Sequence, residues 1–265
     1  MSPDDTMHER RSNVALDWMW GDAERRRRKL RARELSTVGT DPEGEEVQFR
    51  RVGRLEAFLL RLANFLVAAV ALIALSPLIL IVAVLIRIDS PGPVLYRQLR
   101  VGLDRRSLRD VGDGSGRRAS DLGGRPFMIY KFRTMHTKAE LETGPVWATR
   151  DDDRMTRVGR WLRRPRIDEI PQFWNVLRGE MSVVGPRPER PAFVRHLQRE
   201  ISEYRLRNRV PPGITGWAQV NQGYDQDLED VRSKVGYDLE YLERRSLWFD
   251  LWIMLKTLPV MFERD

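Results

Sequence analysis

The sequence contains no cysteine and only three histidines among its 265 residues. Without cysteine there can be no disulfide bond, thiolate metal site or cysteine nucleophile. The histidines, His8, His136 and His196, are too scattered to suggest a zinc site or a Ser-His-Asp triad. These absences direct attention to the carboxylate and basic side chains.

The first sixty residues have no long apolar run, so no cleavable signal peptide is predicted. Residues 1–54 are predicted to be a basic, partly disordered arm. Its RRRRK run at 25–29 favours anionic lipid headgroups, at about 1 kcal/mol per charge, and a solvated charged helix is the alternative. The net charge of +8 and the pI of about 10.1 indicate anionic partners: phospholipid, nucleotide or nucleic acid.

The longest apolar run is residues 62–86, LANFLVAAVALIALSPLILIVAVLI. At about 1.5 Å per residue, a straight helix of this length exceeds the ~30 Å hydrocarbon core of a bilayer. The run therefore predicts a membrane helix. A buried helix of a soluble protein is the alternative, although such helices are seldom so uniformly apolar.

Ser76-Pro77 lies near the middle of the apolar run and predicts a kink, because proline lacks a backbone donor and clashes with the preceding turn. Arginines flank the run on both sides, whereas a crossing helix should have one more positive flank. Both features favour a re-entrant helix, residues 55–90, that enters and leaves through one leaflet.

Residues 91–265 are predicted to form a catalytic domain of mixed structure. The hydrophobic pattern predicts strands at 94–102 and 126–135, a polar loop at 103–124, and helices at 168–178, 191–208 and 228–244. The stretch 246–262, with two tryptophans, favours a helix in the membrane interface; a core helix is the alternative. The fold class is therefore α+β: a kinked re-entrant membrane helix on a small, mostly helical domain with a short β element and interfacial amphipathic helices.

An adjacent acid pair, Asp168-Glu169, is the strongest candidate for chemistry. We expect Asp168 at the N-cap of the 168–178 helix, where free N–H groups and the helix dipole favour its anionic form, with Gly179 at the C-terminal stop. Because adjacent residues do not share a helix face, the two carboxylates can have separate roles, one as nucleophile and one as Mg²⁺ ligand. A capping aspartate followed by a surface glutamate is the alternative.

Basic side chains surround the acid pair in the sequence. Planar guanidinium groups suit bidentate phosphate recognition, and Pro186 and Pro188 stiffen the backbone around one of them. Lys131 supplies a further cation near the end of a predicted strand. Some of the arginines must be ordinary surface charges. The candidates for phosphate binding are Arg133, Arg160, Arg163, Arg164, Arg166, Arg178 and Arg187.

Four motifs together resemble the bacterial sugar transferases, the monotopic polyprenol-phosphate phosphoglycosyl transferases. They are KFRTM at 131–135, DEIPQFWNVLRGEMSVVGPRP at 168–188, PGITGWAQVNQGY at 212–224 and YDLEYLERRSLWFDLWIMLKTL at 237–258. They occur in the family's order, and the resemblance covers roughly residues 55–262. Because the motifs are long, a chance match is very improbable.

The resemblance implies transfer of a sugar 1-phosphate from a UDP-sugar to undecaprenyl phosphate, with release of UMP. It implies Asp168 as covalent nucleophile, Glu169 as the Mg²⁺ ligand and Arg163 as a phosphate contact. Nucleotide or substrate binding is assigned to Lys131, Arg133, Pro186, Arg187, Pro188 and Gln219, and the membrane-helix break to Ser76 and Pro77. The expected location is the bacterial inner membrane, with the catalytic domain facing the cytoplasm and acting in exopolysaccharide or O-antigen assembly.

The chain departs from the family pattern in several places. Asn64 stands where an aspartate is usual, twelve residues before Ser76, so it cannot form a salt bridge that anchors the membrane helix, and a hydrogen bond could replace one. Pro165-Arg166 replaces small polar residues, and the 103–124 loop is long. Longer members carry extra membrane helices and a further domain before this core, so the chain resembles a minimal catalytic unit with a basic arm.

Two other functions fit parts of the sequence. A membrane scaffold for anionic lipid or a glycan-assembly partner would need no paired carboxylates among arginines. A membrane-tethered nucleic-acid binder fits the net charge, but no nucleic-acid module is recognisable, so no nucleic-acid partner is expected. The sequence does not identify the sugar. A Trp-rich C-terminus at the membrane is compatible with a homodimer, and the oligomeric state is left open.

Overall fold

The computed structural model describes most of the chain. The described residues are 35–40, 46–50, 52–105, 122–137, 139, 152–222 and 228–262. The chain divides into two compact units, Met1–Arg51 and Val52–Asp265. In the first, β1 (Leu35–Thr40) and β2 (Glu46–Arg50) form an antiparallel pair. The RRRRK run at 25–29 and most of the 103–124 loop lie outside the described residues.

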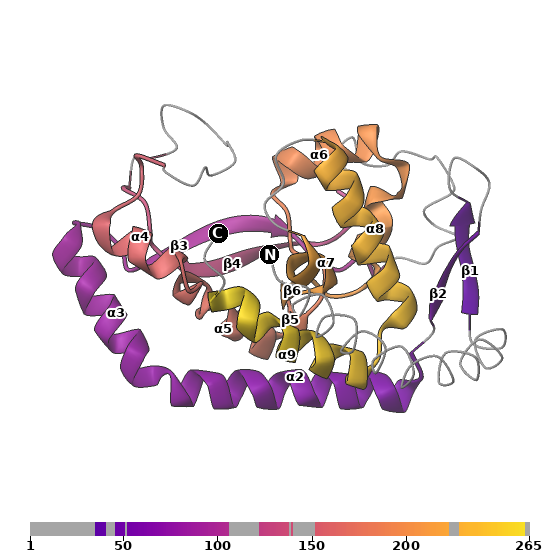
Figure 1. Ribbon diagram of the computed structural model, residues 1–265, viewed down its shortest axis with the longest axis horizontal. Helices are drawn as coiled ribbons and strands as arrows, with labels where there is room; N and C mark the ends of the chain where they lie inside the picture. The colour runs from indigo at the N-terminus through magenta and orange to yellow at the C-terminus, as the bar shows by residue number, and fades with distance from the viewer. Residues whose placement is uncertain are drawn as a thin grey trace, which may run out of the picture. The chain divides into compact units, whose positions relative to one another are not determined.

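The apolar run forms two helices, α2 (Arg54–Ala74) and α3 (Ser76–Asp89), which meet at an angle in Figure 1. Pro77 lies in the first turn of α3 and has no N–H to donate to the carbonyl of Ile73. The hydroxyl of Ser76 donates to that carbonyl instead, at 2.8 Å. The kink predicted at Ser76-Pro77 is therefore confirmed, and the Ile73 carbonyl is satisfied by the Ser76 hydroxyl together with a backbone N–H at the end of α2.

Both helices expose large apolar side chains over one side. The side chains that are more than a third exposed are Leu55, Phe58, Leu59, Leu62, Phe65, Leu66, Val70, Ile73, Leu80, Ile81, Val84, Leu85 and Ile88. By length and composition α2 alone is sufficient to cross a membrane. A core helix of a soluble protein does not leave such a continuous apolar face exposed, so these exposures favour contact with lipid.

The rest of the second unit is helix-rich with two short sheets, as the α+β prediction requires. β3 (Leu95–Val101) and β4 (Pro126–Phe132) pair antiparallel, and β5 (Ser182–Val184) pairs in parallel with β6 (Gly213–Thr215). The helices are α4 (Arg157–Arg163), η2 (Ile167–Glu169), α5 (Gln172–Arg178), α6 (Pro191–Glu200), η3 (Ser202–Arg209), α7 (Trp217–Asn221), α8 (Leu228–Arg244) and α9 (Leu247–Phe262).

The predicted strands and the predicted 228–244 helix are confirmed, but two helix predictions were wrong in extent. The 191–208 helix is broken at Ile201, which is extended, so α6 is followed by the 3-10 helix η3. Ile201 packs into a core cluster with Val194, Leu197 and Tyr204. Burial of this side chain is favoured over continuation of the helix. The 168–178 helix is also interrupted, at Pro171.

Two side chains of α2 fix the helix to the rest of the unit. The amide oxygen of Asn64 accepts a hydrogen bond from the backbone N–H of Val183 at 2.5 Å. Arg61 donates to the carbonyls of Val176 and Leu177 at 2.6 and 2.8 Å, and so caps the C-terminal end of α5. The hydrogen bond expected to replace a salt bridge at Asn64 is therefore present.

Replacing Asn64 with alanine should destabilise the protein by about 1–3 kcal/mol, because the buried N–H of Val183 loses its acceptor. Asn64→Asp keeps the acceptor for Val183 but loses the hydrogen bond from Nδ2 to the Leu60 carbonyl at 2.7 Å, so it should retain only part of the stability. Thermal unfolding in detergent measures both variants. An alanine variant as stable as the wild type would show that this hydrogen bond contributes nothing.

The end of α3 is fixed in a similar way. The carboxylate of Asp89 accepts from the N–H of Val158 at 3.0 Å, in the first turn of α4. The buried guanidinium of Arg133 donates to the carbonyls of Ser90 and Pro91, each at 2.7 Å. Both halves of the kinked helix are therefore attached to elements that flank the acid pair.

Candidate functional site

The acid pair lies in η2, between two backbone features that the helix prediction missed. Arg166, just before η2, has a left-handed backbone with φ of 55°, which no other described non-glycine residue adopts. Pro171 is the N-cap of α5, so Asp168 precedes the helix by one irregular turn. The prediction that Asp168 is the N-cap was wrong, while Gly179 ends α5 as predicted, with φ of 76°.

Glu169 is 6% exposed and is bound by two cations from different elements. Lys131, on β4, lies 2.7 Å from its Oε1 atom. Arg187, in the loop after β5, lies 2.5 Å from Oε1 and 3.3 Å from Oε2. Burial alone would raise the pKa of Glu169, but the charges of Arg187 and Lys131 outweigh it and hold that pKa well below its usual value.

Asp168 is equally buried, yet it makes no hydrogen bond to any described residue. Burial raises its pKa above the usual value; Lys131 opposes this effect and Glu169 adds to it. The expectation that a helix terminus stabilises its anionic form was therefore wrong, because burial dominates. The pair combines one carboxylate fixed by cations with one that has no hydrogen-bond partner among the residues that the structure describes, so separate roles are chemically reasonable.

The structure brings some of the other predicted site residues to the pair and not others. Arg163 is close enough for its charge to lower the pKa of Asp168, although its guanidinium donates to the sulfur of Met155, at 3.5 Å, and not to the acid pair. Arg133 bonds to the end of α3 and not to the pair. Gln219 donates weakly to the Ile214 carbonyl at 3.5 Å, and its own amide oxygen is buried without a partner in the described part of the chain.

The loop containing Pro186, Arg187 and Pro188 is set by backbone contacts that sequence reasoning missed. The N–H of Gly185 donates to Thr215, and the N–H of Gly213 donates to the Pro186 carbonyl, both at 2.9 Å. The two segments approach so closely that a Cβ atom on Gly213 would lie 2.2 Å from the backbone nitrogen of Gly185. The glycines of PGITG and VVGPRP were the available signal for this approach.

The site offers Mg²⁺ few protein ligands but suitable ones. Among the described residues no three acidic or histidine side chains cluster. Mg²⁺ usually takes one or two carboxylates and completes its shell with water and substrate phosphate, so two carboxylates suffice. Oε2 of Glu169 has only the 3.3 Å contact with Arg187, which leaves that oxygen the better placed of the two for a metal.

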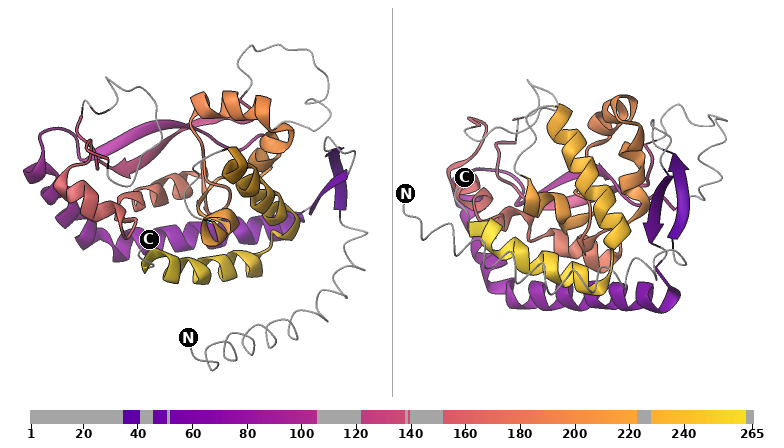
Figure 2. Two further views of the ribbon diagram at one scale, coloured as in Figure 1. Left: turned by 45° about the horizontal axis from the view of Figure 1, so that its top comes forward. Right: turned by 45° about the vertical axis from the view of Figure 1, so that its right-hand side comes forward.

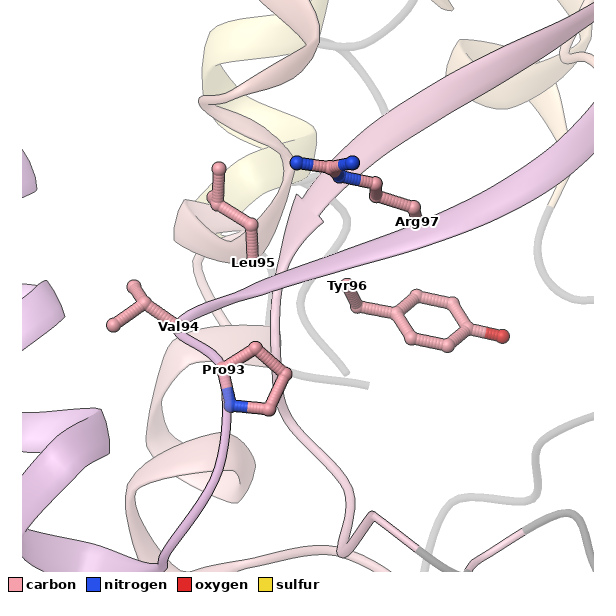
Figure 3. A pocket seen from close by; sticks show the side chains of 5 residues that line it. All are labelled: Pro93, Val94, Leu95, Tyr96 and Arg97. Carbon is pink, nitrogen blue, oxygen red and sulfur yellow. The ribbon is translucent and has the colours of Figure 1, made fainter.

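A shallow, open hollow with a mainly apolar lining lies at the start of β3, directly after the turn that follows α3. Its lining residues are Pro93, Val94, Leu95, Tyr96 and Arg97 (Figure 3). The register of the β3–β4 pair places Tyr96 opposite Lys131, whose amine contacts Glu169. The hollow therefore lies on the strand next to β4, the strand whose Lys131 contacts the acid pair.

Comparison with known proteins places the chain clearly. Residues 55–111 and 114–264 match the family described as bacterial sugar transferase. A UDP-N-acetylgalactosamine-undecaprenyl-phosphate N-acetylgalactosaminephosphotransferase of Aeromonas hydrophila is 45% identical over 202 residues, 76% of this chain and 43% of that protein. UDP-glucose:undecaprenyl-phosphate glucose-1-phosphate transferases of Caulobacter vibrioides and Escherichia coli K12 are 44% and 39% identical over 75% and 76% of this chain. The chain spans 68% and 39% of those two proteins.

Proposed function

Because the chain belongs to the bacterial sugar transferase family, we propose that it transfers a sugar 1-phosphate from a UDP-sugar to undecaprenyl phosphate and releases UMP. Relatives with both N-acetylgalactosamine and glucose in their names are similar to it, so the sugar stays open. The observation that carries the proposal is the asymmetry of the acid pair. Glu169 is held by Lys131 and Arg187, while Asp168 beside it has no hydrogen-bond partner among the described residues.

The proposed reaction has two steps at one phosphorus atom. A carboxylate oxygen of Asp168 attacks the β-phosphorus and forms an acyl phosphate, while the bond to the bridging oxygen breaks and UMP leaves with that oxygen. A phosphate oxygen of undecaprenyl phosphate then attacks the same phosphorus. The acyl-phosphate bond breaks, the carboxylate of Asp168 is restored, and the sugar phosphate is joined to the lipid through a diphosphate.

The positive side chains have a role in both steps. Arg187 and Lys131 contact Glu169, and Arg163 lies close enough to act on Asp168 electrostatically, so a diphosphate at the pair would meet several positive charges. Preorganised cations stabilise the charge that develops on transferred phosphoryl oxygens. Mg²⁺, with Glu169 as its protein ligand, would neutralise further phosphate charge when bound.

We also propose that the protein is a monotopic membrane protein at the cytoplasmic face of the bacterial inner membrane. The break at Ser76-Pro77 and the apolar face of α2 and α3 support a re-entrant insertion. Helix α9 lies beside α2 (Figures 1 and 2) and contacts it, with Ile253 buried and Trp248 and Leu255 exposed. An exposed apolar face with tryptophan supports its position in the membrane interface.

The acceptor lipid is expected to reach the site along the surface of α3. Its exposed Ile88 lies just before the apolar hollow at the start of β3. We assign that hollow to the first isoprene units of undecaprenyl phosphate, because its lining is mainly apolar and the neighbouring strand carries Lys131 toward the acid pair. The phosphate of the lipid would then face the carboxylates.

Release of UMP measures the proposed reaction directly. The purified protein in nanodiscs should release UMP from at least one member of a UDP-sugar panel when undecaprenyl phosphate and Mg²⁺ are present. With UDP-sugar alone, the covalent intermediate limits release to about one equivalent per enzyme. Binding of lipid and nucleotide without UMP release from any UDP-sugar would contradict an enzyme and favour the scaffold alternative.

A further inference from the structure

The loop from Pro186 to Glu189 is held in place by hydrogen bonds to its backbone carbonyl groups. Its four successive carbonyl groups each accept a hydrogen bond from a different residue. The donors are Gly213 N–H to Pro186 at 2.9 Å, Arg207 Nη2 to Arg187 at 3.0 Å, Arg100 Nη1 to Pro188 at 3.1 Å and Val101 N–H to Glu189 at 2.9 Å. An irregular loop with every carbonyl satisfied by protein is rigid, which suits a loop that presents Arg187.

One of these donors belongs to a fully buried ion pair. Arg207, on η3, and Asp238, on α8, have side chains that are 2% and 1% exposed. Both Nε and Nη2 of Arg207 contact Oδ2 of Asp238, at 2.8 and 2.7 Å, and Nη1 donates to the hydroxyl of Tyr204 at 3.1 Å. The planar guanidinium thus has its nitrogens divided among a carboxylate, a hydroxyl and the Arg187 carbonyl.

A buried ion pair is weak evidence for stability, because removing both charges from water offsets most of their attraction. The buried ion pair is therefore better explained by the groups that it positions than by the stability that it adds. Helix α8 holds the loop at a second point, since Lys234 precedes Asp238 by one turn on the same face and contacts Glu189 at 2.8 Å. Burial would raise the pKa of Glu189, but Lys234 and Arg100 lower it to about 2, so this contact is ionic at neutral pH.

We propose that Arg207, held by Asp238, is a positioning residue that fixes the backbone of Arg187 so that its guanidinium stays in contact with Glu169. Arg207 acts through Arg187. Its own hydrogen bonds within the described part of the chain go to Asp238, Tyr204 and Arg187, not to the acid pair. The kinetic consequence rests on the proposed function, while the structural consequence does not. Each is tested separately.

The kinetic test uses two kinds of variant. Arg207→Lys keeps the charge opposite Asp238 but lacks the second nitrogen that reaches the Arg187 carbonyl. Arg207→Met with Asp238→Leu replaces the pair by apolar groups of similar size, which should preserve stability. Both should lower kcat/KM for the UDP-sugar by about 10- to 100-fold, because the phosphate contact is misplaced. KM for undecaprenyl phosphate should be unchanged.

A double-mutant cycle separates positioning from a general loss of stability. In an Arg187→Ala background, Arg207→Lys should have almost no further effect on kcat/KM, since the side chain that it positions is gone. Leu242→Ala, a buried apolar change on the same helix, is the control and should have the same effect in both backgrounds. Equal effects of Arg207→Lys in both backgrounds would overturn the proposal.

A second cycle needs no enzymatic activity. The coupling between Arg187→Ala and Glu169→Gln is measured from thermal unfolding, in the wild type and in the Arg207→Met/Asp238→Leu protein. The proposal expects a clear coupling in the wild type that is lost without the buried pair. Coupling of the same size in both proteins would overturn it, even if UMP release supports the proposed function. Absence of UMP release with loss of coupling would overturn the proposed function alone.

Discussion

Replacing Asp168 with asparagine should reduce sugar-phosphate transfer by at least about 10³-fold, because the amide cannot form the acyl phosphate. The substitution nearly preserves shape, and Asp168 has no hydrogen-bond partner to lose in the described structure. UMP release and trapping of a radiolabelled sugar-phosphate adduct measure the effect. Substantial turnover in the variant would indicate direct transfer between the substrates, with the aspartate acting only as a base or metal ligand.

The same variant should be at least as stable as the wild type. Burial raises the pKa of Asp168, so its ionised form is less favourable in the folded than in the unfolded protein. The Asp168 carboxyl therefore stabilises the folded protein at a pH below its pKa in the unfolded chain, and this stabilisation is lost as the pH rises through its pKa in the folded protein. At neutral pH the neutral amide of asparagine avoids the free-energy cost of a buried charge. Asp250→Asn is the control, because Asp250 is also buried with its pKa raised to about 6, and the amide oxygen of the variant can still accept from the Tyr241 hydroxyl. This variant should retain catalysis.

Replacing Gly213 with alanine should have the largest effect on stability. The new Cβ atom would lie 2.2 Å from the nitrogen of Gly185 and 2.3 Å from the oxygen of Thr215, and both are backbone atoms that cannot rotate away. We expect a loss of about 3 kcal/mol or more, and a fall in Tm of roughly 6–12 °C for a unit of this size. Activity should fall as well, because Gly213 donates to the Pro186 carbonyl.

Gly236→Ala is the control for this prediction. Gly236 lies within α8, and a Cβ atom there meets no other atom within 4 Å. Alanine is favoured over glycine in a helix by about 0.5–1 kcal/mol, so this variant should be slightly more stable than the wild type. Thermal unfolding of both variants under one condition decides the matter, and similar losses at the two positions would contradict the steric argument.

Local signals predicted those parts of the fold that depend on neighbouring residues. Proline at 77 and glycine at 179 act on the backbone next to them, and the break and the helix end are both present. The alternation of β4 and the helical period of α8 extend over enough residues to be read from the chain.

Parts that depend on distant residues were not predictable in this way. Strands β5 and β6 have three residues each and lie some thirty residues apart, so neither shows an alternating pattern. The pairing of Arg207 with Asp238 was not predicted either, because it joins side chains from two different helices. Arg133 read as a phosphate ligand for the same reason, since the carbonyls that it binds belong to the end of another helix.

The acid pair itself was predictable, but its electrostatics were not. Two adjacent carboxylates among arginines indicated the site. The sequence contained no sign that Lys131 and Arg187 would both bind Glu169, while Asp168 accepts no hydrogen bond from any residue in the described segments. That division depends on β4 and the loop after β5 meeting at η2, which is a tertiary feature.

The hydroxyl of Ser76 gives the bend between α2 and α3 its own internal donor. An unpaired carbonyl in hydrocarbon costs several kcal/mol, so a proline bend deep in a bilayer ordinarily depends on water or a neighbouring helix for relief. Here the Ile73 carbonyl accepts from the Ser76 hydroxyl and from a backbone N–H at the end of α2, although Pro77 has no N–H to donate. The proposed insertion of this bend into lipid therefore needs no water molecule or further helix to satisfy the Ile73 carbonyl.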